Sequence, residues 1–409
     1  MLLQVLSLED AKQLLQDRFP AVKPVREEVA LFDALHRVLF QDMLAPEDVP
    51  AFSRSTVDGY AFVANDAFGC SESSPALLEE AFSVPMGTVC TTPLLPGQCA
   101  AVPTGGALPP NADAVAMLEH TERIGKTTVA LQKSAAPGEN VVRRGDDVLA
   151  GSLLLSAGTT LFPPEIGALA ALGITSVPVT RRLLVGILST GDEIVPPDTA
   201  PLPGQMRDVN APMLAAAISQ VGAIPVVYGI CRDDRPALTG AIERAVSECD
   251  VVLLSGGSSA GEKDAAEAIL SALGSILFHG LAIKPGKPTV CGAIQDKPVL
   301  CLPGHPAAAC LVCYRLVLPL LCHLQGSILQ EKTTTATLLT AIPSNHGREE
   351  FVPVRLTEDG AVPVFGKSGL ITKLAATSGY LRILRDAEGL AAGTPVTVFL
   401  WEGLCANHI

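Results

Sequence analysis

The stretch from residue 183 to residue 326 limits the fold more than any other part of the chain. Four times in this stretch, an apolar segment ends in a turn with Gly or Pro beside polar residues: LSTGDE, LLSGGSSAGEKD, IKPGKP and LCLPGHP. Continuously apolar runs such as DVVLLS are typical of parallel strands that are covered on both faces. In an open α/β sheet, such turns lie together at the carboxyl edge of the strands, where ligands bind. The sequence therefore predicts a doubly wound α/β domain with a ligand site at that edge.

Strand and helix patterns alternate through this domain. Apolar runs bounded by turn residues predict the strands, and the segments between them have helical periodicity. Asp234 and Asp264 each precede a helical pattern, where an N-cap is their ordinary role. We expect strands at 183–189, 223–230 and 250–255, and helices at 212–221, 234–248 and 264–274.

The most apolar segment, residues 307–322, is interrupted by Arg315 and Pro319. It is too short to span a bilayer, so we expect a buried helix and no membrane partner. Cys310 and Cys313 lie three residues apart within it, and we interpret them as core thiols rather than a metal or redox pair. The chain has 11 cysteines, an odd number without a disulfide framework. Since no secretory signal is visible either, we expect a reducing cytoplasm.

The rest of the chain predicts three further parts. Helical patterns at 7–19, 31–40 and 165–173 flank a region of short apolar runs, punctuated by Pro and Gly, that is typical of a small β domain. Short alternating runs after Gly326 indicate a terminal β domain. The expected fold is thus multidomain, α/β plus β. Its parts are a discontinuous linker domain (1–45 and 141–180), an inserted β domain (46–140), the α/β domain (181–326) and a C-terminal β domain (327–409).

The charge of the chain limits its partners. The formal net charge is −13 over 409 residues. Nucleic acid is therefore not expected, because phosphate contacts along a duplex need clustered Lys and Arg. A phosphorylated small molecule fits where a local Lys pair or a divalent cation offsets the carboxylates.

The turns at the expected sheet edge carry groups that suit phosphate and magnesium. Glycines allow close approach of the backbone, and exposed amides beside hydroxyls suit an oxyanion. Carboxylates there could share a cation with phosphate oxygens, and oxygen-only ligands suit magnesium. Each turn alone also has a plain structural interpretation as a turn or an N-cap. The candidate oxyanion contacts are Thr190, Gly191, Asp192, Ser255, Gly256, Gly257 and Ser258, and the candidate metal ligands are Glu193, Asp233 or Asp234, and Asp264.

Other polar motifs are less specific. Lys284 and Lys287 stand in a turn stiffened by two prolines and a glycine, which suits a phosphate clamp or, alternatively, a solvated turn between strands. Asp58 and Thr104 each precede glycine and have a turn interpretation. The seven histidines lack metal-ligand spacing, which argues against zinc. No Ser-His-Asp or Cys-His arrangement is legible.

Nine motifs occur along the chain in the order RSTVDGYA, PTGGALPPNADAV, RRGDD, STGDE, GQMRDVN, RDD, SGGSSAGEKD, KPGKP and LPGHP. In this order they resemble the molybdopterin molybdenumtransferases, the molybdenum insertases of the MoeA type, which include the E domain of gephyrin. The resemblance covers essentially the whole chain. It implies an L-shaped homodimer whose subunits have a discontinuous linker domain, an inserted β domain, a doubly wound α/β domain and a C-terminal β barrel.

The resemblance also implies a reaction. The family takes adenylylated molybdopterin and molybdate, cleaves the adenylate in a magnesium-dependent step with release of AMP, and leaves molybdenum on the dithiolene. The implied cleft lies between the α/β domain of one subunit and the inserted β domain of the other. Transient docking with a molybdopterin adenylyltransferase and with apo-molybdoenzymes is left open.

Site residues carry over where the motifs match. The carboxylates would hold magnesium on the pyrophosphate, and the lysines and loop amides would stabilise charge as the phosphoanhydride breaks. The implied catalytic residues are Asp58, Thr104, Asp147, Glu193, Lys284 and Lys287. Beyond the edge loops, the implied contacts to pterin or molybdate are Pro303, Gly304, Arg348 and Ser368.

The chain departs from the usual family pattern at several positions. His305 stands where the family usually has Asn, Ala308 where it has Ser, and Thr56-Val57 where it has Ala-Met. TGG likewise replaces TGA, and SSAG replaces VSVG. The acidic residues and both lysines are present, so the enzyme interpretation stands, and His305 leaves open the preference for molybdate or tungstate. The alternatives are a tungsten-inserting version, an adenylyltransferase of similar α/β fold, and a non-catalytic scaffold.

Overall fold

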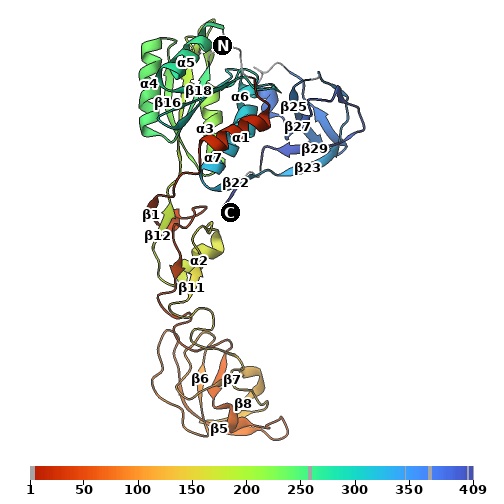
Figure 1. Ribbon diagram of the computed structural model, residues 1–409. Helices are drawn as coiled ribbons and strands as arrows, with labels where there is room; N and C mark the ends of the chain where they lie inside the picture. Colours follow the sequence, from red (N-terminus) through yellow and green to blue (C-terminus); the bar gives the residue numbers. More distant parts are fainter. Residues whose placement is uncertain (1–4, 257–259, 346, 367–370, 403–404, 409) are drawn as a thin grey trace. The chain divides into compact units, whose positions relative to one another are not determined.

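The structure is a computed structural model that describes residues 5–256, 260–345, 347–366, 371–402 and 405–408 (Figure 1). The chain forms two compact units. The first unit comprises residues 1–27, 36–38 and 180–409, and the second comprises residues 28–35 and 39–179. Residues 1–27 lie in the first unit, whereas the sequence predicted residues 1–45 for the linker domain.

A six-stranded sheet with the order β16-β13-β17-β21-β20-β18 forms the centre of the first unit (Figure 1). The first four strands run parallel to one another. Strand β20 runs antiparallel to β21, and β18 runs antiparallel to β20. In β17, Val251 and Leu253 enter one apolar core with α3, while Val252 and Leu254 enter another with α4. Both faces of the sheet are therefore covered, which confirms the doubly wound fold. The bounds are β13 (Leu184–Thr190), β16 (Ile224–Cys231), β17 (Val251–Gly256), β18 (Ser275–His279), β20 (Val290–Ile294), β21 (Lys297–Leu302), α3 (Asn210–Gln220), α4 (Arg235–Glu248) and α5 (Ala260–Leu273).

The most apolar segment forms one continuous helical stretch made of α6 (Pro306–Val312), a π-helical part (Cys313–Val317) and α7 (Leu318–Leu324). At 19 residues it is long and apolar enough to cross a membrane, so the expectation that it is too short was wrong. Pro319 directly follows the π-helical part, where the regular i→i−4 hydrogen bonds are already interrupted, so the helical stretch continues through it. Most of the segment, 83%, is buried inside the protein, which confirms a core helix. Helix α1 (Leu8–Arg18), capped by Ser7, packs in the same core.

The C-terminal part of the first unit is a second sheet, with the order β19-β25-β27-β29-β23 and β26 paired to β25. This confirms a terminal β domain. Its first strand, β19, comes from the KPGKP motif, so the α/β domain and the β domain share this sheet. The bounds are β19 (Ile283–Lys284), β23 (Thr333–Thr337), β25 (Glu349–Thr357), β26 (Gly360–Pro363), β27 (Gly379–Ile383) and β29 (Pro395–Leu400).

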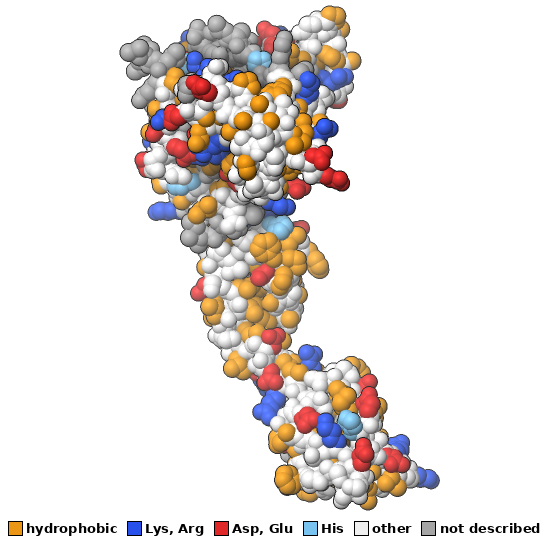
Figure 2. Space-filling view, turned by 90° about the vertical axis from the view of Figure 1, so that its right-hand side faces the viewer, with side chains coloured by type: hydrophobic (Ala, Val, Ile, Leu, Met, Phe, Trp, Pro, Cys, Tyr) orange, Lys and Arg blue, Asp and Glu red, His pale blue; other side chains and the backbone are white. Residues whose placement is uncertain are grey.

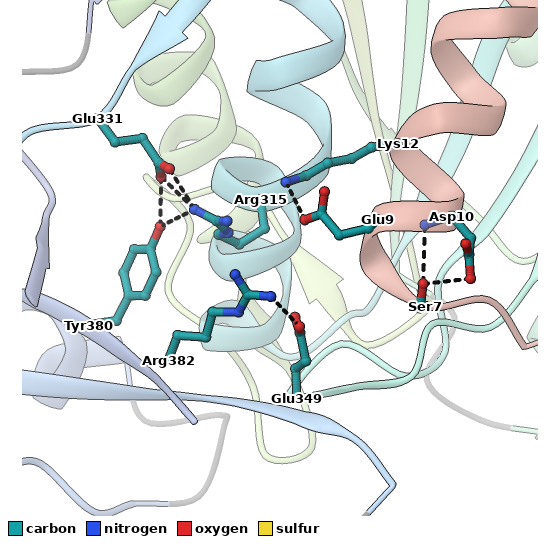
Figure 3. A network of polar contacts seen from close by, with 9 residues as sticks. All are labelled: Ser7, Glu9, Asp10, Lys12, Arg315, Glu331, Glu349, Tyr380 and Arg382. Carbon is teal, nitrogen blue, oxygen red and sulfur yellow. Dashed lines mark hydrogen bonds and ion pairs between the residues drawn. The ribbon is translucent and has the colours of Figure 1, made fainter. Parts of the chain in front are cut away.

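A buried ion pair joins the core helix to this second sheet (Figure 3). Arg315, 5% exposed, donates to both carboxylate oxygens of Glu331 at 2.6 and 2.7 Å. The Tyr380 hydroxyl donates to the same carboxylate at 3.1 Å, and Arg382 pairs with Glu349 nearby. The guanidinium of Arg315 also lies over the rings of Phe351 and Phe399. The residue that interrupts the apolar segment therefore anchors the β domain to the α/β domain.

In the second unit, the short apolar runs form a six-stranded sheet with the order β7-β4-β6-β5-β9-β8. Phe62 packs on one face of this sheet and Ala61 on the other, each within its own apolar cluster. In the face shown in Figure 2, acidic and basic side chains are mixed over this sheet, and no continuous basic area is visible among the described residues. The bounds are β4 (Gly59–Phe62), β5 (Ala76–Ser83), β6 (Gln98–Val102), β7 (Ala114–Met117), β8 (Thr121–Ile124) and β9 (Thr128–Leu131).

The remainder of the second unit has its own small core, which includes Leu31, Leu39 and Leu169. The helix expected at 31–40 was wrong: only one turn, Leu31–Asp33, is helical, and it is a 3-10 turn. Leu39 instead forms a β-bridge with Val179, so tertiary pairing outweighs the local helical pattern. The elements are β1 (Arg26–Ala30), which pairs with β12 (Ser176–Thr180), β2 (Met43–Leu44), which pairs with β11 (Leu153–Leu155), and α2 (Pro163–Ala171).

Candidate functional site

The four parallel strands of the first unit end at one level. Thr190 at the end of β13 pairs with Cys231 of β16 and with Gly256 of β17, and Ser255 pairs with Leu302 of β21. The loops that follow these strands therefore begin side by side at the carboxyl edge of the sheet. Of the expected contacts, Thr190, Gly191, Asp192, Ser255 and Gly256 lie at this edge, while Gly257 and Ser258 lie outside the described residues.

Strands β13 and β17 approach so closely at this edge that position 256 requires glycine. Gly256 has φ +144°, and a Cβ built there would lie 2.1 Å from the carbonyl oxygen of Thr190. Backbone atoms cannot move away without breaking the pairing of β13 and β17, so no larger residue fits. Gly256 is thus required by strand packing.

The acidic residues at the edge have different local roles. Asp192 and Asp233 bond reciprocally, each carboxylate accepting from the main-chain nitrogen of the other at 3.3 and 3.4 Å. Asp234 caps α4 by accepting from the nitrogen of Ala237 at 3.0 Å, which confirms the expected N-cap. Glu193 is half-buried beside this pair of loops.

The expectation that Asp264 begins a helix was wrong. Helix α5 starts at Ala260, before the acidic residue in the chain. Asp264 therefore lies inside the helix, and its side chain is outside the described part of the structure. A contribution of the Asp264 carboxylate to the edge is still a prediction.

Among the residues that the structure describes, no group of three or more His, Cys, Asp or Glu side chains is placed to hold a metal ion. The described donors at the edge are carboxylate oxygens on exposed loops. This donor set fits magnesium, which keeps several waters and is commonly held by one or two carboxylates together with substrate phosphates. It does not suit zinc, which prefers a closed set of nitrogen and sulfur ligands.

A buried polar network beneath the edge was missed by the sequence analysis, which assigned no role to Asp208 or Asn210. Asp208 Oδ2 accepts from the hydroxyl of Ser189 at 2.5 Å. Its other oxygen accepts from the main-chain nitrogens of Asn210 and Ala211, at 3.1 Å each, at the start of α3. Asn210 Nδ2 then donates to Ser255 Oγ at 2.7 Å and to the carbonyl of Gly304 at 2.8 Å. Buried serines at strand ends beside a DxN motif are the signal that could have found it.

The lysines of the KPGKP motif behave differently from one another. Lys284 Nζ lies 2.8 Å from Glu350 Oε1, and the other carboxylate oxygen of Glu350 accepts from Ser344 Oγ at 2.9 Å. Lys284 and Glu350 line a cavity of about 490 Å³ between the α/β and C-terminal β domains. Lys287 is exposed. Lys284 therefore has a carboxylate partner in this state, which the sequence analysis did not expect.

Further expected contacts lie near the same loops. Pro303 is buried, and Gly304 is held through its carbonyl by Asn210. His305 is exposed and begins α6, where its carbonyl accepts from the nitrogen of Ala308 at 3.0 Å. Arg348 is exposed at the start of the second sheet. Ser368 lies outside the described residues.

The expected residues of the second unit lie around the short strand β3 (Arg54–Ser55). Asp58 Oδ1 accepts from the nitrogen of Thr104 at 2.7 Å, which brings these two predicted residues together. Asp147 is exposed, and its main-chain nitrogen donates to Val49 at 3.0 Å. Arg54 pairs with Val142 of β10 (Val141–Val142), so the RSTVDGYA and RRGDD motifs are neighbours.

Family models match three successive parts of the chain. They are described as "MoeA N-terminal region (domain I and II)" for residues 6–173, "Probable molybdopterin binding domain" for 186–323 and "MoeA C-terminal region (domain IV)" for 335–401. The molybdopterin molybdenumtransferase of Bacillus subtilis is 34% identical over 388 residues, covering 91% of this chain and 89% of the relative. The chain belongs to the MoeA family.

Other MoeA relatives match over nearly their whole length. A molybdopterin molybdenumtransferase of Mycobacterium tuberculosis is 32% identical over 96% of this chain and 99% of the relative. A crystal structure of the MoeA protein from Pyrococcus horikosii has a TM-score of 0.85 at 38% identity and covers 98% of this chain and 100% of that one. The expected multidomain fold is therefore confirmed, and this MoeA-family chain is an enzyme of the transferase class.

The paired cysteines in the core helix of this MoeA-family protein are core thiols. Cys310 and Cys313 are buried at 7% and 0% exposure. Burial raises the pKa of Cys310 to about 12 and also raises that of Cys313. A protonated thiol is a poor nucleophile and metal ligand, so burial suits this pair to packing rather than to metal or redox chemistry.

Proposed function

We propose that this protein acts in molybdenum cofactor biosynthesis by inserting molybdate into adenylylated molybdopterin with release of AMP. The observation that carries the proposal is the sheet edge at which four strands end level, with close-packed backbone at Gly256 and carboxylates in the next loops. In this proposal, main-chain amides of these loops would bind a phosphate and the carboxylates would bind a cation, which a pyrophosphate linkage needs. The similarity to proteins named molybdopterin molybdenumtransferase supports it.

Each group at the edge has a task in the proposed reaction. The amides after β13 and β17 would bind phosphate oxygens. Glu193, Asp233 and Asp264 would hold the magnesium ion, with Asp234 as the alternative to Asp233. When bound, magnesium would neutralise charge on the pyrophosphate oxygens.

Lysines would act on the anionic end of the substrate. Lys284 and Lys287 would stabilise the charge that develops as the phosphoanhydride breaks, and Lys284 would exchange its contact with Glu350 for the substrate. Arg348 and Ser368 would contact molybdate. Asp58, Thr104 and Asp147, in the second unit, complete the proposed set of catalytic residues.

We propose a homodimer in the cytoplasm as the working form. The mixed surface charge and the net charge of −13 argue against nucleic acid as a partner, and magnesium would offset the repulsion between the carboxylates and a small anionic substrate. Transient docking with a molybdopterin adenylyltransferase would deliver the substrate, and apo-molybdoenzymes would receive the product.

The test is AMP release from adenylylated molybdopterin by the purified protein with magnesium, adding molybdate or tungstate in turn. We expect molybdate to stimulate release. Glu193→Gln should lower the rate about 100-fold, because the metal loses a charged ligand. Asp198→Asn, an exposed acid a few residues further along the same loop, is the matched control and should keep the wild-type rate.

Other outcomes would change the proposal. Stimulation by tungstate alone would indicate a tungsten-inserting enzyme, with His305 the first residue to substitute. Tight pterin binding without AMP release, or an unchanged rate in Glu193→Gln, would contradict the proposed reaction and favour a scaffold.

A further inference from the structure

The hydrogen bonds through Asp208 and Asn210 reach three of the site loops at once. Asp208 binds Ser189, the residue before the Thr190 loop of β13. Asn210 binds Ser255, the residue before Gly256 of β17, and the carbonyl of Gly304 in the loop after β21. The two residues therefore connect β13, β17 and β21 at the level where their loops begin.

Capping of α3 by Asp208 accounts for part of this network but not for all of it. Ser189, Asp208, Asn210 and Ser255 are only 2%, 7%, 7% and 2% exposed. Asn210 Oδ1 is buried and has no hydrogen-bond partner among the described residues. A buried acceptor without a partner destabilises a protein, and apolar side chains of the same size would avoid that cost. The unpaired acceptor of this network lowers the stability of the folded protein, and the network lies directly below the candidate site. We therefore expect the network to have a role in the site.

The network also reaches open space beside the loops. Asp208 lines a cavity of about 660 Å³ together with Gly191, Asp192 and Arg232. Asp208 therefore both makes buried hydrogen bonds and lines this cavity. A change at Asp208 or Asn210 would be transmitted to the loop that carries Asp192 and Glu193.

We propose that Asp208 and Asn210 are positioning residues that fix the spacing of the three loops at the sheet edge. The loop after β13 carries the acidic residues, the end of β17 carries the closely packed glycine, and the loop after β21 leads into α6. Reaction needs groups from different loops on one substrate at the same time, and small displacements are costly. The link to AMP release rests on the proposed function, whereas the coupling of the loops does not.

The experiment compares Asn210→Leu with Gln220→Leu. Leu is close to Asn in size and removes both donors, and Gln220 is a carboxamide at the opposite end of the same helix, bound to Tyr314 at 3.1 Å. Hydrogen exchange should speed up in Asn210→Leu at 188–194, 251–256 and 301–306 together, and stay unchanged there in Gln220→Leu. The kcat for AMP release should fall about 10- to 100-fold in Asn210→Leu, with KM for the pterin changed by less than about threefold.

The two readouts separate the possible failures. If exchange rises only at the start of α3, or kcat stays at the wild-type value, the positioning role is overturned. If the wild-type protein releases no AMP, the proposed function fails, while the exchange result still decides the coupling. Should Asn210→Leu not fold, Ser255→Ala removes one of the same bonds and should give a smaller change in the same loops.

Discussion

The two groups of predicted site residues are built in different ways. At the sheet edge of the first unit, strand ends pair in register above a buried polar network. In the second unit, Asp58 and Thr104 are both exposed, and one hydrogen bond joins them although they are 46 residues apart in the chain. The edge is fixed by buried contacts, whereas the contact between Asp58 and Thr104 lies at the surface. Substitutions at the edge should therefore affect stability and function together, and those at the surface contact should affect function alone.

The largest effect is expected at Gly256. Gly256→Ala places a methyl group against the carbonyl of Thr190 in a backbone conformation that alanine avoids. The free energy of unfolding should fall by about 3–5 kcal/mol, since overpacking adds to backbone strain. Gly222→Ala is the control, because Gly222 also has positive φ but faces open space, and it should cost about 1 kcal/mol. Equal losses in denaturant titrations of the two variants would show that the close contact is unimportant.

The same substitution in both regions gives the sharpest comparison. Asp208→Asn weakens buried hydrogen bonds to a charged carboxylate and should cost about 2–3 kcal/mol of stability. Asp58→Asn changes an exposed turn and should cost less than about 1 kcal/mol. AMP release should nevertheless fall in both variants. A large loss of stability in Asp58→Asn would remove the distinction between the regions.

A smaller effect is expected from alkaline pH on the first unit. Burial raises the pKa of Cys301 and Cys310 to about 12 in the folded state, from about 9 for an exposed thiol. The folded state therefore favours the protonated thiol, and this stability is complete below pH 9 and is lost as pH rises toward 12. Each thiol should cost about 1.4 kcal/mol per pH unit in that range. Cys310→Ala should flatten the dependence in denaturant titrations at pH 8 and 10, and an unchanged slope would contradict the pKa assignment.

The sequence was sufficient where local pattern and tertiary structure agree. The apolar runs of β13 and β17 are buried on both faces, and Asp234 caps α4, both as predicted. The convergence of the loops followed from the general geometry of parallel sheets. The pair Asp58 and Thr104 could be named only through the motif resemblance, because a turn aspartate has no distinguishing local pattern.

The failures have physical causes that a single sequence does not contain. The pattern at 31–40 is helical in period, but Leu39 pairs with Val179, far along the chain. The network of Asp208 and Asn210 depends on three strand ends meeting, and the partner of Lys284 depends on β19 joining the second sheet at Glu350. Such contacts between distant segments become visible only in the folded structure.

The most direct measurement is a crystal structure of the protein with adenylylated molybdopterin and magnesium. The account predicts the pyrophosphate at the carboxyl edge of the first-unit sheet, in contact with amides next to Gly191 and Gly256 and with the metal beside Glu193. Electron density for the pyrophosphate at any other part of the molecule, with this edge empty, would contradict the central claim.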